Sequence, residues 1–334
     1  MSRNMGLWIS ETIAAPVKLP LPILTFPVIQ LMGITVRELI SDSATQAQAM
    51  KLLADRNRSL CAVSMMDLSV EAEAFGSEIQ VNDHEVPVVR GKIIADQEDA
   101  DRLAVPEIGT GRTRLYIDAI GKAAQTIMDR PVLAGVIGPY SLAGRLVGTA
   151  EIMKASRRRP ELVHTVMAKC TQFITAYVEA YREAGADGVF MAEPLTGLLS
   201  PKMAEDFSEP YVRQIVEQVQ REDFIVMYHN CGDSAVNMLS SILRTGARGY
   251  HFGNAIRMKD AVGGCPDSVL CMGNVKPGTF VFGTPREIYQ ETRQIMEECG
   301  GHPNFVISSG CDIPPIAKWE NIDSFYQAAA SCGG

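Results

Sequence analysis

The stretch LVHTVMAKCTQFITAYVEAYREAG (residues 162–185), followed directly by ADGVFMAEP (186–194), decides the fold. Its first part spaces apolar residues as a helix does and ends at Gly185, and its second part is an apolar run of strand length. Glycine commonly ends a helix, and a strand that is apolar throughout is typical of a parallel strand buried on both faces. The stretch therefore predicts one helix–strand unit of an α/β protein.

The same order of helix, glycine and apolar strand returns in MLSSILRTGARGYHFGN (238–254) and in EIYQETRQIMEECGGHPNFVISSG (287–310). Apolar runs of strand length lie at residues 22–28, 60–66, 131–137, 187–192, 223–228, 248–252, 268–272 and 304–309. Eight such units predict a (β/α)8 TIM barrel in a single domain of residues 1–334. A doubly wound open sheet is the alternative, but no GxGxxG follows the first strands and no Walker sequence occurs.

One segment between the second and third predicted strands does not fit the helix–strand order. EIQVNDHEVPVVRGKII (78–94) alternates apolar and polar residues around the pair Asn82-Asp83. Alternation around such a turn is typical of a β-hairpin. We expect a hairpin insertion near the barrel mouth and not a second domain.

Composition narrows the class of protein. With 46% hydrophobic and 21% charged residues among 334, the chain is neither disordered nor a disulfide scaffold. A net charge of −8 argues against nucleic acid as a partner. Residues 13–34 are apolar, but Pro16, Pro20, Pro22 and Pro27 would break a membrane-spanning helix there. We expect a cytoplasmic chain without a membrane partner, whose eight cysteines are buried thiols or metal ligands.

Reactive residues of such barrels stand where the strands end. FIVMYHNCG (224–232) runs from an apolar strand into His229 and Cys231, which the two-residue period of extended chain sends to one side. SSGCDIPP (308–315) brings Cys311 to another strand end. Two cysteines and a histidine suit zinc, whose catalytic sites use three protein ligands. The alternative from these residues alone is a histidine that caps a strand and cysteines that pack as small apolar side chains.

Two carboxylates also follow predicted strands. Glu193 in MAEPLTG (191–197) has two possible roles. It is either a catalytic group, which acts as a fourth zinc ligand or as an acceptor that orients His229, or a structural carboxylate that binds loop amides. Asp67 in MMDLSVEAEAFG (65–76) is expected either to hold polar groups of a substrate or to be structural. His251, inside the sixth predicted strand, is expected to be a hydrogen-bonded core residue. The other cysteines are expected to be buried thiols within strands and helices (Cys61, Cys170, Cys271 and Cys299) or free thiols in a loop and the tail (Cys265 and Cys332).

Around these residues the chain resembles the uroporphyrinogen decarboxylase family, and within it the zinc-dependent methylcobamide:coenzyme M methyltransferase branch. The resemblance rests on DLSVEAEAFG (67–76), GVIGPYSLAGRL (135–146), GADGVFMAEPLTG (185–197), YHNCG (228–232), HFGNAI (251–256), MGNVKPG (272–278), SSGCDIPP (308–315) and WENI (319–322). It implies a barrel with its site at the strand ends. It also implies that His229, Cys231 and Cys311 are the zinc ligands.

Two departures from the decarboxylases separate the branches. Those enzymes carry an arginine-rich segment after the first strand that grips the carboxylates of a porphyrinogen, whereas this chain has FPVIQLMGITVREL (26–39) there. They also tend to have histidine where this chain has Cys311. The resemblance therefore implies an enzyme of one-carbon transfer, which moves a methyl group between a methylated corrinoid protein and a thiol such as coenzyme M.

Several points stay open in that interpretation. No DxHxxG-like corrinoid motif occurs in the chain, so a separate corrinoid protein is the expected partner and its methylcobamide the expected second cofactor. Arg145 and Lys276 are candidates to balance the charge of an anionic acceptor. The alternatives are a decarboxylase-like enzyme, or a corrinoid methyltransferase with another donor or acceptor, such as homocysteine, tetrahydrofolate, a methyl ether or a methylamine.

Overall fold

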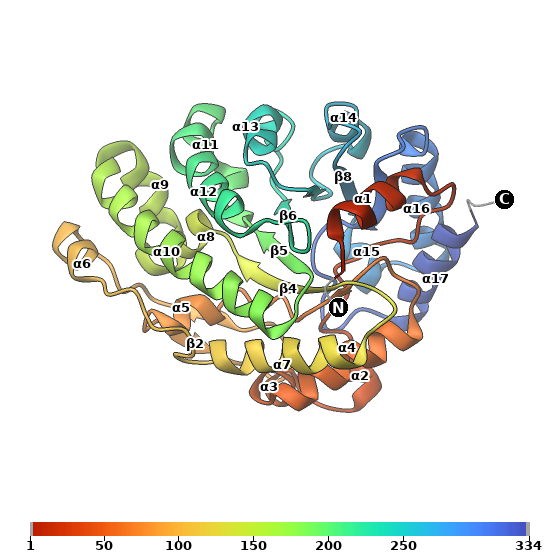
Figure 1. Cartoon of the computed structure of the whole chain (residues 1–334), viewed down its shortest axis with the longest axis horizontal. Coiled ribbons are helices and arrows are strands. Elements are labelled where there is room, and N and C mark those ends of the chain that lie inside the picture. Colours follow the sequence, from red (N-terminus) through yellow and green to blue (C-terminus); the bar gives the residue numbers. More distant parts are fainter. Residues whose placement is uncertain (1–2, 332–334) are drawn as a thin grey trace.

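The computed structural model describes residues 3–331, and at its centre lies a curled parallel sheet surrounded by helices (Figure 1). The seven strands follow one another in the sheet as β1 (Ala62–Val63), β4 (Val132–Ile137), β5 (Gly188–Ala192), β6 (Ile225–Asn230), β7 (Gly249–Phe252), β8 (Leu270–Val275) and β9 (Phe305–Ser309). Each neighbouring pair is parallel. The predicted α/β class and seven of the eight predicted strands are confirmed.

Helices cover the outer face of this sheet, as Figure 1 shows. The first half contains α1 (Met5–Ala14), α2 (Val28–Met32), α3 (Val36–Ser41), α4 (Ser43–Arg56), α5 (Val70–Ala74), α6 (Gln97–Arg102), α7 (Thr113–Thr126), α8 (Pro139–Val147) and α9 (Thr149–Arg158). The second half contains α10 (Pro160–Ala184), the 3₁₀ turn η1 (Pro194–Leu198), α11 (Pro201–Phe207), α12 (Glu209–Val219), α13 (Leu239–Arg244), α14 (Met258–Val262), α15 (Pro277–Phe282), α16 (Pro285–Cys299) and α17 (Trp319–Ala330). As predicted, α10 ends at Gly185, whose φ of +105° is the left-handed conformation that glycine adopts without strain.

Both faces of the sheet are buried, which explains why its strands are apolar throughout. Alternate residues divide between two clusters: Val189 and Met191 of β5 pack towards the helices, whereas Phe190 packs inside the curl. The inner cluster also draws Leu133, Met227 and Val306 from other strands. Side chains of strands that are distant in the sheet can meet there only because the sheet curls round on itself.

The first predicted strand, residues 22–28, is wrong as a strand. Residues 18–25 belong to no helix or strand, and Val28 already begins helix α2. Residues 20–24 nevertheless join the two edges of the sheet, since Leu21 N donates to Ile307 O of β9 (3.0 Å) and Leu60 N, just before β1, donates to Pro20 O (3.0 Å). Pro20 and Pro22 have no N–H group, so they cannot continue a ladder of hydrogen bonds. We call residues 20–24 the seam.

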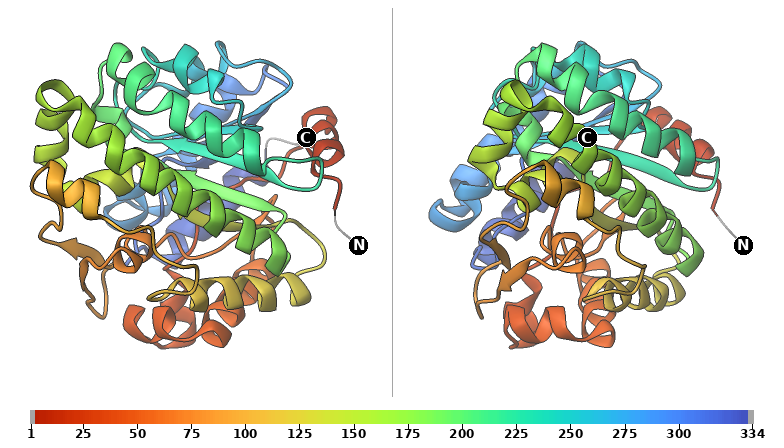
Figure 2. Two further views of the ribbon diagram at one scale, coloured as in Figure 1. Left: turned by 60° about the vertical axis from the view of Figure 1, so that its left-hand side comes forward. Right: turned by 90° about the vertical axis from the view of Figure 1, so that its left-hand side faces the viewer.

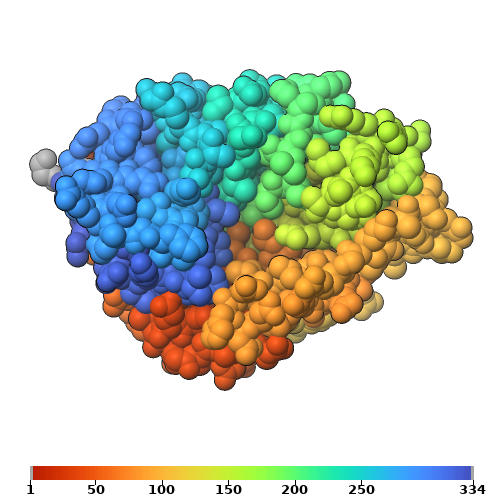
Figure 3. Space-filling model, turned by 180° about the vertical axis from the view of Figure 1, so that it is seen from behind, coloured from red at the N-terminus to blue at the C-terminus, as the bar shows by residue number. Residues whose placement is uncertain are grey.

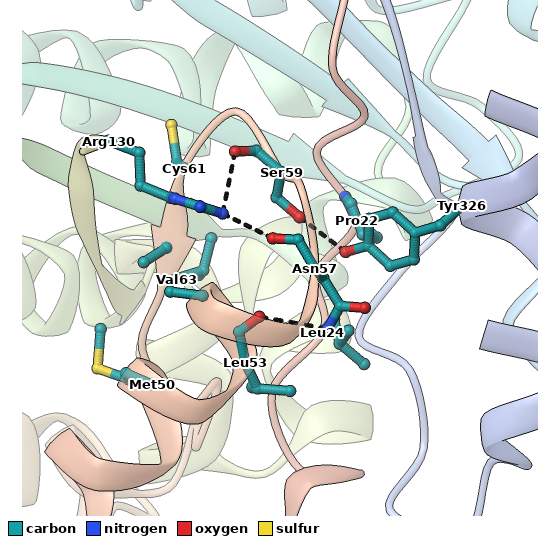
Figure 4. A pocket seen from close by; sticks show the side chains of 12 residues that line it. Pro22, Leu24, Met50, Leu53, Asn57, Ser59, Cys61, Val63, Arg130 and Tyr326 are labelled. Atoms are coloured by element: carbon teal, nitrogen blue, oxygen red, sulfur yellow. Dashed lines mark hydrogen bonds between the residues drawn. The ribbon is translucent and has the colours of Figure 1, made fainter. Parts of the chain in front are cut away.

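Side chains supply polar contacts beside the seam, where a small pocket lies between Pro22, Leu24 and the helix α17 (Figure 4). Arg130 Nη1 donates to the carbonyl oxygens of Asn57 (2.7 Å) and Ser59 (3.4 Å). The Ser59 hydroxyl lies 2.7 Å from that of Tyr326. These contacts tie the loop before β1 to α17 where the ladder is interrupted.

The predicted hairpin is confirmed. Strands β2 (Glu78–Gln80) and β3 (Val88–Arg90) form an antiparallel pair. In the sequence they lie between β1 and β4, which are the second and third predicted strands. Arg37 of α3 anchors the turn, because its Nε donates to Asp83 (3.1 Å) and its Nη2 to Val81 O (2.7 Å). Figures 2 and 3 show this segment, in orange, along one side of the molecule and across its back face. No helix within residues 3–331 is long and apolar enough to cross a membrane.

Candidate metal centre

The structure brings His229, Cys231 and Cys311 together. One possible ligand atom from each lies within 4.8 Å of those of the other two. His229 stands near the end of β6, Cys231 follows that strand directly, and Cys311 comes two residues after β9. Three steps between neighbouring strands separate β6 from β9, roughly 14 Å in a flat sheet. The three residues therefore meet because the sheet curls.

Close backbone packing fixes the position of Cys231. A Cβ atom at Gly253 would lie 2.5 Å from Cys231 Cα, so only glycine allows the loop after β7 to approach this closely. Asn274 Nδ2 holds that loop through Gly253 O (2.9 Å). Asn230 Oδ1 accepts from Gly232 N (2.9 Å) on the other side of Cys231. The asparagines at these strand ends thus hold the backbone on which the cysteine stands.

The donor atoms of the three residues have few other partners. His229 Nε2 is buried and has no hydrogen-bond partner. A hydrogen bond with the Cys311 thiol lowers the pKa of Cys231, while the same contact and burial raise the pKa of Cys311 well above its ordinary value. The pair would thus carry one thiolate more readily than two until a cation joins it. A buried, unpartnered imidazole nitrogen beside two sulfur atoms fits a zinc ion, which prefers nitrogen and sulfur ligands.

His251 is a hydrogen-bonded core residue, as expected. Its Nδ1 lies 2.7 Å from His229 Nδ1, and its Nε2 lies 2.7 Å from Ser308 Oγ. Burial, followed by the proximity of His229, lowers the pKa of His251 well below its ordinary value. No motif in the sequence connects these two histidines. Their equal register on neighbouring strands, His229 opposite His251, is the signal that could have done so.

The carboxylate of Glu193 accepts hydrogen bonds from the first residues of α8. One of its oxygens accepts from Tyr140 N (2.9 Å), and the other accepts from Ser141 N (2.9 Å) and Ser141 Oγ (2.6 Å). Burial raises the pKa of Glu193 to about 7, and these hydrogen bonds oppose the rise. It binds backbone amides, which is the structural role considered for it, while His229 Nδ1 contacts His251 instead. A catalytic role for Glu193 stays a prediction.

Asp67 is equally occupied. One oxygen accepts from Arg112 and from Tyr116 Oη (2.9 Å), and the other accepts from Ser69 N (3.1 Å). Arg112 also donates to Glu73 (2.6 Å), so the guanidinium joins two carboxylates. No sequence pattern pointed to Arg112. A role of Asp67 towards a substrate stays a prediction.

The remaining candidates differ in how accessible they are. Arg145 is half-buried at the end of α8, burial lowers its pKa, and no ion pair is seen for it within residues 3–331. Lys276 is exposed. The cysteines expected as packing residues or bystanders are buried thiols wherever the structure describes them (Cys61, Cys170, Cys265, Cys271 and Cys299). Cys332 lies outside the described residues.

Comparison with known proteins places the chain in a family. The sequence model of the family "Uroporphyrinogen decarboxylase (URO-D)" matches residues 28–332. The chain belongs to the uroporphyrinogen decarboxylase family. Among relatives in this family, methylcobamide:CoM methyltransferase MtbA of Methanosarcina acetivorans is 26% identical over 268 residues, which cover 79% of this chain and 77% of that protein. A uroporphyrinogen decarboxylase of Methylobacillus flagellatus is 27% identical over 301 residues, covering 86% and 82%.

Solved structures agree on the fold. A methyltransferase from Methanosarcina mazei superimposes with a TM-score of 0.87 at 22% identity over the whole of both chains. A putative vitamin-B12 independent methionine synthase from Listeria monocytogenes has a TM-score of 0.61 at 10% identity, covering 96% of this chain and 98% of that one. The fold of this uroporphyrinogen decarboxylase family member thus occurs in solved structures that are named as a methyltransferase and as a methionine synthase.

Proposed function

We propose that this protein is a zinc-dependent methyltransferase, which moves a methyl group from a methylated corrinoid protein to a thiol such as coenzyme M. The observation that carries the proposal is the convergence of His229, Cys231 and Cys311, in which a buried imidazole nitrogen has no partner. Three protein ligands leave one position free for a substrate atom, as catalytic zinc sites require. Names of relatives support the same activity.

The chemistry follows from the ligands. Zinc held by these residues would keep the acceptor sulfur as a thiolate, the form of the thiol that is a nucleophile. The thiolates of Cys231 and Cys311 balance the two positive charges of the ion, so no excess positive charge weakens the nucleophile. The acceptor sulfur would bond to the methyl carbon of the methylated corrinoid substrate, and the electron pair of the broken carbon–cobalt bond would stay with the corrinoid. The thiol proton passes to solvent, and the product is a thioether.

The first helices argue against a porphyrinogen substrate. Arg37 is the arginine of the segment 26–39, and it binds Asp83 and Val81 O of the hairpin. A guanidinium held in this way does not supply the cationic grip that a substrate with many carboxylates needs. A small anionic acceptor needs only one counter-charge, and Arg145, half-buried without an ion pair among the described residues, is the better candidate for it than exposed Lys276.

The proposed architecture is a single (β/α)8 domain over residues 1–334. The seam takes the place of the first predicted strand and completes the set of eight. The hydrogen bonds from the seam to β9 and to Leu60 support this closure. The second cofactor would be the methylcobamide carried by a separate corrinoid protein. That partner would dock on the loops after the strands, including residues 67–76, 194–210 and 311–320.

Zinc content and methyl transfer test the proposal together. The purified chain is analysed for zinc and then assayed with free methylcobalamin against coenzyme M, homocysteine, an uncharged thiol and tetrahydrofolate. We expect one zinc per chain and transfer to at least one thiol. Cys231→Ala should lose both, while the matched variant Cys170→Ala, altered at a buried thiol in α10, should keep both. Full zinc content in Cys231→Ala, or no transfer to any thiol by the zinc-loaded protein, would overturn the proposal.

Two alternatives predict different results in the same experiment. A decarboxylase-like enzyme, suggested by the relatives of that name, would contain no zinc and would tolerate loss of Cys231 and Cys311. A corrinoid methyltransferase with another partner molecule, such as a methyl ether or methylamine donor, would keep the zinc. It would fail only with the thiol panel.

A further inference from the structure

A chain of hydrogen bonds leads from His229 to the seam. His229 Nδ1 lies 2.7 Å from His251 Nδ1, His251 Nε2 lies 2.7 Å from Ser308 Oγ, and Ser308 Oγ lies 2.6 Å from Leu21 O. All three side chains are buried. The Ser308 hydroxyl and each neutral imidazole carry one hydrogen that can be donated. The group at the end of the chain, Leu21 O, therefore decides where each of these hydrogens lies.

The direction is set at the Leu21 carbonyl, which can only accept. Ser308 must therefore spend its single hydrogen on Leu21 O. Towards His251 the same hydroxyl can then only accept, so His251 Nε2 carries a hydrogen. A neutral imidazole with its hydrogen on Nε2 offers a lone pair at Nδ1.

The contact between the two histidines then has one arrangement. A doubly protonated His251 would be a cation with no exposed surface, and none of the hydrogen bonds described for it involves a carboxylate. His229 Nδ1–H therefore donates to His251 Nδ1. His251 O, 3.3 Å from the same nitrogen, is a second acceptor that favours this proton position. His229 Nε2 is left with a bare lone pair, and it is the atom that is buried without a partner.

Two serine hydroxyls of β9 bind the backbone of the seam. Ser308 Oγ donates to Leu21 O, and Ser309 Oγ accepts from Ile23 N (3.0 Å). Of these two hydroxyls, the Ser308 hydroxyl contacts His251, whereas the Ser309 hydroxyl binds Ile23 N.

We propose that Ser308 and His251 are positioning residues, which hold His229 as the Nδ1–H tautomer so that its Nε2 binds zinc. The inference rests on the proposed function, since it assumes that His229 is a zinc ligand. Outer partners of this kind fix the ring and the tautomer of a metal-binding histidine, and their loss typically weakens metal binding about 10–100-fold.

Zinc affinity of matched serine variants tests the proposal. The dissociation constant is measured by competition with a chelator. Ser308→Ala should bind zinc about 10–100-fold more weakly than the wild type. Ser309→Ala loses a neighbouring hydrogen bond to the seam but not the contact with His251, so its affinity should change less than about threefold. Ser308→Thr, which keeps the hydroxyl and suits a strand, should restore most of the affinity.

A spectroscopic measurement separates tautomer control from a general loosening of the site. In metal-free protein labelled with ¹⁵N at its five histidines, long-range ¹H–¹⁵N spectra report which ring nitrogen of His229 carries the hydrogen. We expect Nδ1–H in the wild type and Ser309→Ala, and a mixture of tautomers in Ser308→Ala.

The outcomes distinguish the two proposals. A wild type without bound zinc contradicts the proposed function. A wild type that binds zinc while Ser308→Ala binds it equally well overturns the positioning role alone. An Nε2–H tautomer of His229 in the metal-free wild type also overturns that role.

Discussion

Two groups of residues at the strand ends differ in how their polar atoms are used. Asp67 and Glu193, after β1 and β5, have every oxygen bound to other parts of the protein. His229, Cys231 and Cys311, after β6 and β9, converge with a buried nitrogen that has no partner. The first group is already satisfied within the chain. The second group still has donor atoms to offer to a ligand.

The cost of burial explains this difference. A carboxylate buried without hydrogen bonds is expensive, so a stable fold must surround it with donors, as α8 and Arg112 do here. A thiol behaves as a small apolar group and can be buried without partners at little cost. A site for a soft metal ion can therefore be built in advance from cysteines, whereas carboxylates tend to be used up by the fold.

The strongest test of the comparison is to remove a ligand from the second group. Cys311→Ala should reduce zinc affinity by more than the roughly 100-fold that loss of an outer-shell partner costs at most, because it deletes a bond to the metal itself. Competition with a chelator measures the loss, and Cys265→Ala, altered at a buried loop thiol, is the control. If Cys311→Ala binds zinc as tightly as the control, the second group is not a metal centre.

In the first group the largest effect is expected at Asp67. Asp67→Ala would leave the largely buried guanidinium of Arg112 with one carboxylate in place of two. Breaking a buried ion pair in this way costs about 3–5 kcal/mol of unfolding free energy. Urea unfolding measures it, with Asp118→Ala as a control, since the exposed pair of Asp118 with Arg114 should cost less than about 1 kcal/mol. Zinc content should not change. A stable Asp67→Ala protein that fails to transfer methyl groups would instead assign Asp67 to the substrate.

Substitution of Glu193 should cost less stability than substitution of Asp67. It also tests whether Glu193 belongs with the occupied carboxylates or with the metal ligands. Glu193→Ala would leave the amides of Tyr140 and Ser141 without their acceptor, and each buried unpaired donor costs about 1–3 kcal/mol. We expect a loss of about 2–4 kcal/mol in urea unfolding, with zinc affinity within a few-fold of the wild type. If stability is unchanged and zinc affinity falls as in Cys311→Ala, Glu193 is a metal ligand after all.

The two groups also differ in how far the sequence could predict them. His229 lies near the end of one strand and Cys231 directly follows that strand, and the rule that strand ends meet brought Cys311 to them. Apart from Ser69, the partners of these carboxylates are distant: Arg112 stands 45 residues from Asp67, and Ser141 stands 52 residues from Glu193. No local pattern links them. Periodicity cannot choose between a carboxylate that waits for a substrate and one that caps a helix.

Local sequence patterns also fail to predict one part of the fold, the segment of residues 22–28. Seven strands and the hairpin follow from local apolar patterns, which the tertiary structure reinforces. In residues 22–28 the apolar pattern predicted a strand, but Val28 begins a helix, and side chains of β9 supply part of the bonding to the seam. The hydrogen-bond chain to His229 depends on that exception, so pattern analysis could not reveal it.

The smallest predicted effect concerns Glu71, a carboxylate with a hydrogen-bond partner on only one of its two oxygens. Glu71 Oε1 accepts from Ile137 N (3.0 Å), while its buried Oε2 has no partner. Burial raises the pKa of Glu71 to about 7 from an ordinary value near 4.5. The folded state therefore holds a proton that the unfolded chain has released between these values, and stability falls as pH rises through that window, by at most about 1.4 kcal/mol per pH unit.

Glu71→Gln removes that titration and keeps the acceptor for Ile137 N. Urea unfolding between pH 5 and 7 should show a shallower decline of stability with pH than in the wild type, by up to about 1 kcal/mol per pH unit. Glu183→Gln, at an exposed position of α10, should leave the slope unchanged. Equal slopes in the wild type and Glu71→Gln would mean that Glu71 is ionised in the fold. It would then join Asp67, which pairs with Arg112, as a buried carboxylate whose charge the protein compensates.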